Sequence, residues 1–237
     1  MKKYLILSII SFVIIVNQHV VAQIQTREKT KIVRRTSLNY LLWLPADYKK
    51  DKSKTFPVMI FLHGSGERGE NLDLVKKNGP PSFVENRPDF PFILISPQCP
   101  DGTWWEIEDL QAMLEKVLDK YRIDRSRIYL TGLSMGGFGT WSWACKYPDQ
   151  FAAIAPVCGG GDAIFADELK NVPVWAFHGE VDPVVPVKRS VEMVETVNTN
   201  GGSAKMTVYP GVGHDSWINA YNDEELYKWL LSNKKSK

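Results

Sequence analysis

The chain has 237 residues, of which 44% are hydrophobic, 11% aromatic and 24% charged. This length suits one α/β domain with a large buried core, and the composition is ordinary for a globular protein. The formal net charge is +2. Residues 1–22 hold two of the 29 basic side chains and none of the 27 acidic ones, so the rest of the chain is neutral. A neutral chain gives no electrostatic reason to expect binding to nucleic acid or to an anionic membrane.

The N-terminus has the layout of a secretory signal peptide. Lys2 and Lys3 precede an apolar run from Leu5 to Val16, and modest side chains at 20–22 precede a cleavage position before Gln23. The apolar run is short for a membrane span, and an uncleaved anchor is the alternative. We expect a signal peptide at residues 1–22, one domain at residues 23–237, and export to the periplasm or the medium without stable membrane insertion.

After this segment, strand-like apolar runs alternate with helical patterns. Such alternation predicts a sheet built from β-α-β units with helices on both faces. Residues 106–121, for example, carry apolar side chains at helical spacing. The predicted strands cover residues 38–44, 57–62, 92–96, 127–132, 151–157, 172–177 and 205–209, and the predicted helices cover 106–121, 136–147, 187–198 and 216–232.

Two further features limit what the chain can build. The connection from Cys158 to Val172 is short, so it has no room for a large helical cap over the sheet. Cys99, Cys145 and Cys158 are odd in number, so at most one intramolecular disulfide can form among them. Their spacing fits no zinc pattern, and we expect buried, inert thiols for at least some of them.

The most informative motif is Gly132-Leu133-Ser134-Met135-Gly136, which directly follows a predicted strand and opens a predicted helix. This context is typical of a nucleophile elbow, a turn so tight that residues two positions either side of the serine must lack bulk. The turn exposes Ser134 Oγ above the sheet. It also aims the Met135 N–H and the helix N-terminus at a point where an oxyanion would be stabilised.

An acid and a histidine follow the serine in the required order, each after its own strand. Asp182 lies in the loop after the strand at 172–177, and His214 lies in the glycine-rich loop after the strand at 205–209. All three residues therefore belong to the C-terminal edge of one sheet, where open α/β folds bind their ligands. We predict that Ser134 is the nucleophile, His214 the general base and Asp182 the residue that orients His214.

Each assignment has rivals in the sequence. Glu180 directly follows a glycine at the end of a strand, and Asp215 is adjacent to His214, so both are poorly placed to orient the histidine. Asp162 is the alternative acid one strand earlier. His63 and His178 both precede a glycine at a strand end, and we interpret each as a structural hydrogen-bonding residue rather than a catalytic one.

The second oxyanion donor is expected from the loop His63-Gly64-Ser65-Gly66, which follows the strand at 57–62. We predict that this donor is the backbone N–H of Ser65, with Gly66 as the alternative. The next two residues, Glu67 and Arg68, either form a solvated charge pair or hold this loop in place.

Together these motifs resemble those of the α/β-hydrolase superfamily over nearly the whole chain from Leu41 to Leu230. The chain is most similar to small exported esterases without a cap, in the feruloyl and acetyl-xylan esterase, dienelactone-hydrolase-like and prolyl-oligopeptidase-like "predicted peptidase" branches. The resemblance implies an α/β-hydrolase fold, that is, a mostly parallel twisted sheet of about eight strands with helices on both faces and no large cap. The resemblance identifies the superfamily but says little about the substrate.

Substrate contacts are expected from the loop after the strand at 92–96. Trp104 and Trp105 are suited to stacking on an aromatic acyl group or a sugar ring, or else pack in the core. In the resembling esterases a tryptophan of this loop often lines the acyl pocket, which favours Trp105 as the substrate contact, and Gln98 is a candidate for a polar contact.

The sequence therefore predicts an exported serine hydrolase that cleaves a carboxylic ester, with feruloyl or acetyl groups on plant polysaccharide as candidate substrates. It contains no phosphate-binding loop, nucleotide fingerprint or metal-ligand cluster, so no cofactor or metal is expected. The alternatives are a serine peptidase, an acyltransferase or thioesterase on the same scaffold, and a non-catalytic carbohydrate-binding protein. The sequence does not predict the oligomeric state.

Overall fold

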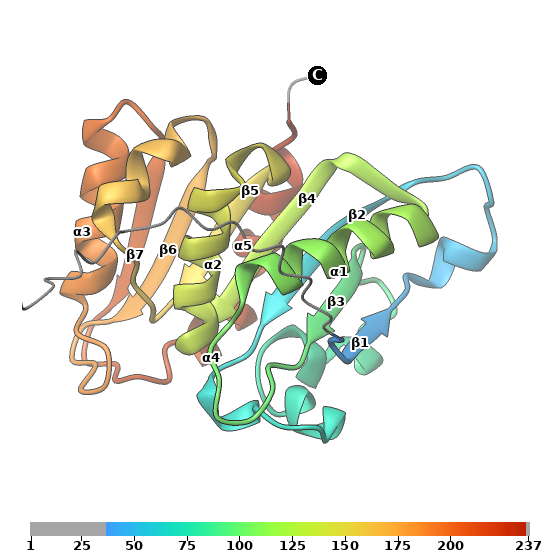
Figure 1. Cartoon of the computed structure of the whole chain (residues 1–237), viewed down its shortest axis with the longest axis horizontal. Coiled ribbons are helices and arrows are strands. Elements are labelled where there is room, and N and C mark those ends of the chain that lie inside the picture. The colour runs from blue at the N-terminus through green and yellow to red at the C-terminus, as the bar shows by residue number, and fades with distance from the viewer. Residues whose placement is uncertain (1–36, 236–237) are drawn as a thin grey trace, which may run out of the picture. The chain divides into compact units, whose positions relative to one another are not determined.

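A computed structural model describes residues 37–235, and the predicted signal peptide at residues 1–22 lies outside them. Seven strands form one sheet in the order β1-β3-β2-β4-β5-β6-β7 (Figure 1). The edge strand β1 pairs antiparallel with β3, and every other neighbouring pair is parallel. The strands are β1 (Tyr40–Trp43), β2 (Phe56–Leu62), β3 (Ile93–Pro97), β4 (Ile123–Leu133), β5 (Ala153–Val157), β6 (Val174–Gly179) and β7 (Ala204–Tyr209).

Five α-helices in the described part of the chain cover the two faces of this sheet. Figure 1 shows α1, α2 and α3 in front of the strands and α5 behind them. The helices are α1 (Ile107–Lys120), α2 (Met135–Lys146), α3 (Lys188–Thr199), α4 (Trp217–Asn222) and α5 (Glu224–Ser232). The chain therefore has the expected α/β architecture, with seven strands among the described residues instead of about eight.

The C-terminal helix is the clearest departure from the predicted elements. A single helix over 216–232 was expected, but the chain forms two helices separated at Asp223. Asp223 has extended backbone angles, and its side chain accepts a hydrogen bond from the Glu225 N–H. An aspartate in this position is a favourable N-cap, so it starts a new helix rather than continuing the old one.

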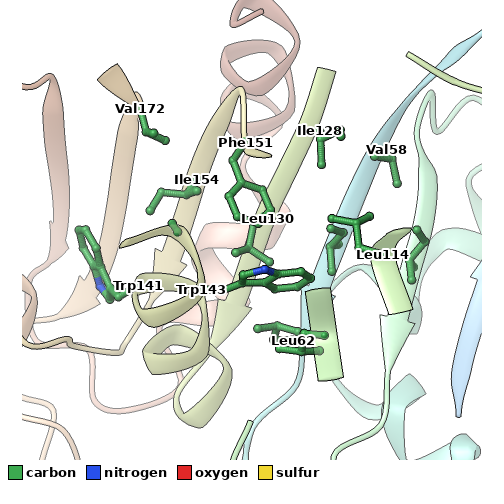
Figure 2. Packing of buried hydrophobic residues seen from close by; sticks show 14 of the residues in the cluster. Val58, Leu62, Leu114, Ile128, Leu130, Trp141, Trp143, Phe151, Ile154 and Val172 are labelled. Atoms are coloured by element: carbon green, nitrogen blue, oxygen red, sulfur yellow. The ribbon is translucent and has the colours of Figure 1, made fainter. Parts of the chain in front are cut away.

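Two hydrophobic cores lie on opposite faces of the sheet. The larger one packs α1, α2 and α3 onto the strands, and Trp141 and Trp143 are its largest fully buried side chains. Figure 2 shows Trp143 lying among Leu130 and Leu62 of the sheet. The second core contains Phe61, Tyr129 and Phe177 of the strands together with Tyr221 and Tyr227 of α4 and α5. Burial on both faces explains why the central strands read as continuous apolar runs.

The loops at the C-terminal ends of the parallel strands hold all of the predicted catalytic residues. Between β5 and β6 the chain forms only a short segment with the 3₁₀ turn η7 (Ala163–Asn171), so no cap domain is inserted at this position. The three cysteines are free thiols. None of the described helices has the length and apolar composition needed to cross a membrane.

Candidate active site

Ser134 sits at a strained turn between β4 and α2. Its backbone φ is 53°, in the left-handed region that non-glycine residues rarely adopt. The turn requires glycine on both sides. A Cβ atom on Gly132 would lie 2.4 Å from the Gly136 carbonyl oxygen, and one on Gly136 would lie 1.9 Å from that of Leu62. Strain of this kind is characteristic of functional sites.

The side chains of Ser134, His214 and Asp182 form a hydrogen-bonded chain. His214 Nε2 lies 2.9 Å from Ser134 Oγ, and His214 Nδ1 lies 2.7 Å from Asp182 Oδ2. Because a carboxylate can only accept, Nδ1 carries the proton and Nε2 is free to accept from the serine hydroxyl. The three residues come from the loops after β4, β6 and β7. The structure thus brings together the three residues singled out in the sequence.

Asp182 is held firmly in the loop after β6. Its Oδ1 accepts hydrogen bonds of 2.9 Å from the N–H groups of both Val184 and Val185. Burial alone would raise the pKa of the Asp182 carboxyl, but the hydrogen bonds from His214 and these two N–H groups hold the pKa below its usual value. The carboxylate is therefore ionised at neutral pH and oriented toward His214.

The rival acids have other contacts. Glu180 Oε2 accepts from the Gly211 N–H, 2.9 Å away, which ties the β6 loop to the β7 loop. Asp162 accepts from the Ile164 N–H as the N-cap of η7. Asp215 is exposed beside His214. The acid within hydrogen-bond distance of the His214 ring is Asp182.

The two predicted oxyanion donors occupy equivalent positions at helix starts. Met135 is the first residue of α2, and Ser65 is the first residue of the 3₁₀ turn η2 (Ser65–Glu67). The first N–H groups of a helix have no partner within the helix, so both are available to a ligand. The α2 N-terminus approaches the end of β2 closely, since a Cβ on Gly136 would also lie 2.7 Å from the His63 carbonyl oxygen.

Gln98 does not face the open site, contrary to expectation. Its side chain is 3% exposed, and Nε2 donates to the backbone oxygens of Glu67 at 2.9 Å and Asn71 at 2.8 Å. The residue lies directly after β3, and its amide reaches the loop that follows β2. The contacts of Gln98 therefore favour a structural role, in which it ties the end of β3 to the loop after β2, over a contact with substrate.

The structure also does not favour Trp105 as a substrate contact, because this residue is buried. Trp105 is 8% exposed, packs against Gly139 and the His63 ring, and donates from Nε1 to the His63 carbonyl at 3.3 Å. Its neighbour Trp104 is 60% exposed and makes an edge contact with Phe138, with ring centroids 6.1 Å apart. Phe138 is one helical turn from Ser134, so Trp104 is the tryptophan available to a ligand.

Two charged residues of the predicted oxyanion loop make contacts that fix its conformation. Arg68 donates from Nε to the Ser65 carbonyl at 3.0 Å and from Nη1 to the Thr103 carbonyl at 3.1 Å. Glu67 is 6% exposed and accepts from Asn78 Nδ2 at 2.8 Å. These contacts support the interpretation that Glu67 and Arg68 hold the loop in place, rather than forming a solvated charge pair.

Two hollows on the surface differ in their relation to the triad. One of about 450 Å³ is lined by Trp141, Phe165 and Met193 and contains none of the three residues. Another of about 270 Å³ is lined by Asn78, Phe83 and Trp217. The Trp217 ring makes an edge contact with His214 at 5.4 Å between centroids, so one wall residue of this second hollow contacts the histidine.

The fold and the geometry around Ser134 are those of an α/β-hydrolase. Residues 102–229 match the model of the dienelactone hydrolase family. The chain belongs to this family.

The chain is similar to several proteins that are named as esterases. A probable feruloyl esterase C of Aspergillus oryzae is 31% identical over 76% of this chain and 68% of its own length. The corresponding Aspergillus niger protein is 28% identical over 75% of this chain and 67% of its own length. A thermostable esterase of known structure is 35% identical, with a TM-score of 0.77 over 84% of this chain and 60% of that one. Family and relatives indicate a hydrolase that acts on esters, although the chain spans only about two thirds of the curated relatives it matches.

Proposed function

We propose that the protein is an exported serine esterase that works through an acyl-enzyme on Ser134. The observation that carries this proposal is the continuous chain from Ser134 Oγ through His214 to Asp182, with links of 2.9 and 2.7 Å. Hydrogen-bond contact between a nucleophile, a base and an orienting acid is the arrangement that activates a serine hydroxyl.

In the first half-reaction, Ser134 Oγ attacks the acyl carbon of the ester and His214 Nε2 takes the hydroxyl proton. The carbonyl oxygen becomes an oxyanion that accepts hydrogen bonds from the N–H groups of Met135 and Ser65. His214 then gives the proton to the leaving alcohol oxygen as the carbon–oxygen bond breaks. Asp182 stabilises the imidazolium that exists between these two transfers.

In the second half-reaction, water replaces the alcohol. His214 Nε2 takes a proton from the water as the water oxygen attacks the acyl carbon. The same two N–H groups donate hydrogen bonds to the second oxyanion. Return of the proton to Ser134 Oγ releases the carboxylic acid and restores the free enzyme. The chemistry uses groups of the chain and water alone, so we propose that no cofactor or metal takes part.

The substrate class we propose is an aromatic acyl ester of a carbohydrate, with feruloyl esters as the first candidates. The exposed Trp104 ring and the adjacent Phe138 present aromatic surface one helical turn from the nucleophile, and aromatic rings stack favourably on a flat acyl group. The relatives named as feruloyl esterases support this choice.

A substrate panel tests this function. Methyl ferulate, p-nitrophenyl acetate, acetylated xylan, a thioester and a short peptide amide are compared by kcat/KM. We expect release of acid from the hydroxycinnamate ester and no cleavage of the amide. Rapid hydrolysis of short alkyl esters with no release from hydroxycinnamate or acetylated-sugar esters would contradict the substrate proposal. Preferred amide cleavage would indicate a peptidase, and transfer to an added alcohol would indicate an acyltransferase.

We also propose cleavage before Gln23 and a single catalytic domain from residue 23 to 237, on the layout of the N-terminal segment. Mass measurement of protein secreted by a bacterial or fungal host tests both. The expected N-terminus is Gln23, and a cell-bound product that retains residues 1–22 would contradict it.

A further inference from the structure

We infer that His63 is a positioning residue that sets the direction of the Ser65 N–H in the oxyanion hole. The inference rests on the proposed function and adds a residue to it. His63 directly follows β2, is fully buried, and makes no hydrogen bond with the Ser134–His214–Asp182 chain in the described structure. Its two ring nitrogens make hydrogen bonds with the backbone of Gly64 and of Cys99.

The two ring nitrogens of His63 have partners that decide where its proton lies. The backbone N–H of Cys99 points at Nε2 from 3.0 Å, and an N–H can only donate, so Nε2 accepts. Nδ1 lies 2.6 Å from the Gly64 carbonyl oxygen, which can only accept, so Nδ1 donates. Both contacts require the same neutral tautomer with the proton on Nδ1. The other acceptor near Nδ1, Glu67 Oε2, is 3.9 Å away and beyond hydrogen-bond distance.

Holding the Gly64 carbonyl also orients the next N–H. The carbonyl of Gly64 and the N–H of Ser65 belong to one planar trans peptide unit, in which the two groups point in opposite directions. A donor that holds the carbonyl toward His63 therefore turns the Ser65 N–H away from His63. The Glu67 N–H, 3.4 Å from the same carbonyl oxygen, acts in the same sense.

The ring itself is well fixed. Trp105 packs against it with ring centroids 4.8 Å apart, and Cys99 anchors it to the end of β3. A Cβ on Gly64 would lie 2.9 Å from Leu133 Cδ1, next to the elbow. Gly64 is thus hydrogen-bonded to the His63 ring and packed closely against the residue that precedes Ser134. Preorganised donors of this kind cost no reorganisation during the reaction.

Two amide variants separate the two hydrogen bonds. His63→Asn places an amide N–H near the position of Nδ1 and keeps the donor to Gly64, while it loses the acceptor for Cys99. His63→Gln places its amide near Nε2, so it keeps the acceptor for Cys99 and loses the donor to Gly64. Each variant loses one buried hydrogen bond, so the two are expected to have similar melting temperatures.

The expected result is a difference in kcat. His63→Gln should lose about 10- to 100-fold in kcat on p-nitrophenyl acetate with KM little changed, because one oxyanion donor is misdirected rather than removed. Its affinity for a trifluoromethyl ketone, which forms a tetrahedral adduct, should fall by the same factor. His63→Asn should stay close to the wild type in both measurements. Equal losses in the two variants, or a larger loss in His63→Asn, would overturn the inference.

A measurement on the unmodified protein covers the case in which neither variant folds. The ¹³C and ¹⁵N shifts of the His63 ring should show the neutral tautomer with the proton on Nδ1, and the other tautomer would overturn the inference. A Ser134→Ala control separates this inference from the proposed function. If that control retains activity, the proposed function fails whatever His63 does. If it is inactive and the His63 pair shows no difference, only the positioning role fails.

Discussion

His178 Nε2 lies 3.2 Å from Asp182 Oδ2, the same oxygen that receives the hydrogen bond from His214. His178 Nε2 also lies 2.8 Å from the Val185 carbonyl oxygen. Both neighbours are acceptors, so Nε2 carries a proton. Burial lowers the pKa of His178, which keeps the ring neutral at neutral pH. The carboxylate of Asp182 is therefore held between two imidazole rings.

Removing the His178 ring should alter the pH dependence of the reaction. In His178→Met the Asp182 carboxylate loses the nearby Nε2–H dipole and becomes more basic, so it stabilises positive charge in the triad more strongly. We expect the acid limb of kcat/KM to move up by roughly half a pH unit or more. His178→Gln is the matched control, because its amide N–H replaces Nε2–H. An unmoved acid limb in His178→Met would show that the 3.2 Å contact has no influence on the triad.

The elbow should not tolerate a methyl group at Gly136. Its Cβ would lie 1.9 Å from the Leu62 carbonyl oxygen, which is backbone and unable to move aside. We expect Gly136→Ala to destabilise the fold by on the order of 4 kcal/mol or more, measured by urea denaturation. Gly66→Ala is the control, since nothing lies within 4 Å of its Cβ, and its stability should change by less than about 0.5 kcal/mol. Equal stabilities of the two variants would contradict the close approach of α2 to β2.

The buried neutral His63 should make the protein less stable in mild acid. Burial lowers the pKa of His63 from 6.5 to about 4, so the unfolded chain binds a proton between these pH values and the folded chain does not. Stability is therefore complete above pH 6.5 and is lost as the pH falls, by about 3 kcal/mol at pH 4. Urea denaturation at pH 7.5 and pH 4.5 measures the loss. The loss should be smaller in His63→Gln, and an equal loss would assign it to other groups.

Trp104 should affect aromatic substrates selectively. Its exposed ring beside Phe138 offers stacking surface to an aromatic acyl group, and such contacts contribute about 0.5–1.5 kcal/mol. We expect Trp104→Ala to raise KM for methyl ferulate about 3- to 10-fold and to leave p-nitrophenyl acetate nearly unaffected. Phe165→Ala, at another exposed aromatic residue that lines the hollow apart from the triad, is the control. A parallel change on both esters would argue against an acyl contact.

The parts of the site that could be predicted are those with local signals. Gly132 and Gly136 indicate the elbow because only glycine fits that turn. The strand–loop pattern places Asp182 and His214 at the same sheet edge. The sheet and the helices on its two faces follow from the alternation of apolar runs with helical spacing.

The parts that could not be predicted depend on packing between distant segments. Which of Trp104 and Trp105 points inward is decided by Gly139 and His63, which lie far away in the sequence. The burial of Gln98 depends likewise on backbone oxygens of the loop after β2. The start of α5 did have a local signal, an aspartate N-cap at Asp223 followed by two acidic residues, but the continuous apolar spacing over 216–232 concealed it.

Covalent labelling of Ser134 tests the central claim most directly. The purified protein is treated with a fluorophosphonate, digested and mapped by mass spectrometry, and its hydrolysis of p-nitrophenyl acetate is followed in parallel with that of Ser134→Ala. We predict one adduct, on the peptide that contains Ser134, together with loss of hydrolysis. Ser134→Ala should take up no label and lose at least about 10⁴-fold in kcat. An adduct on another residue, or an active Ser134→Ala variant, would contradict the assignment of Ser134 as the nucleophile.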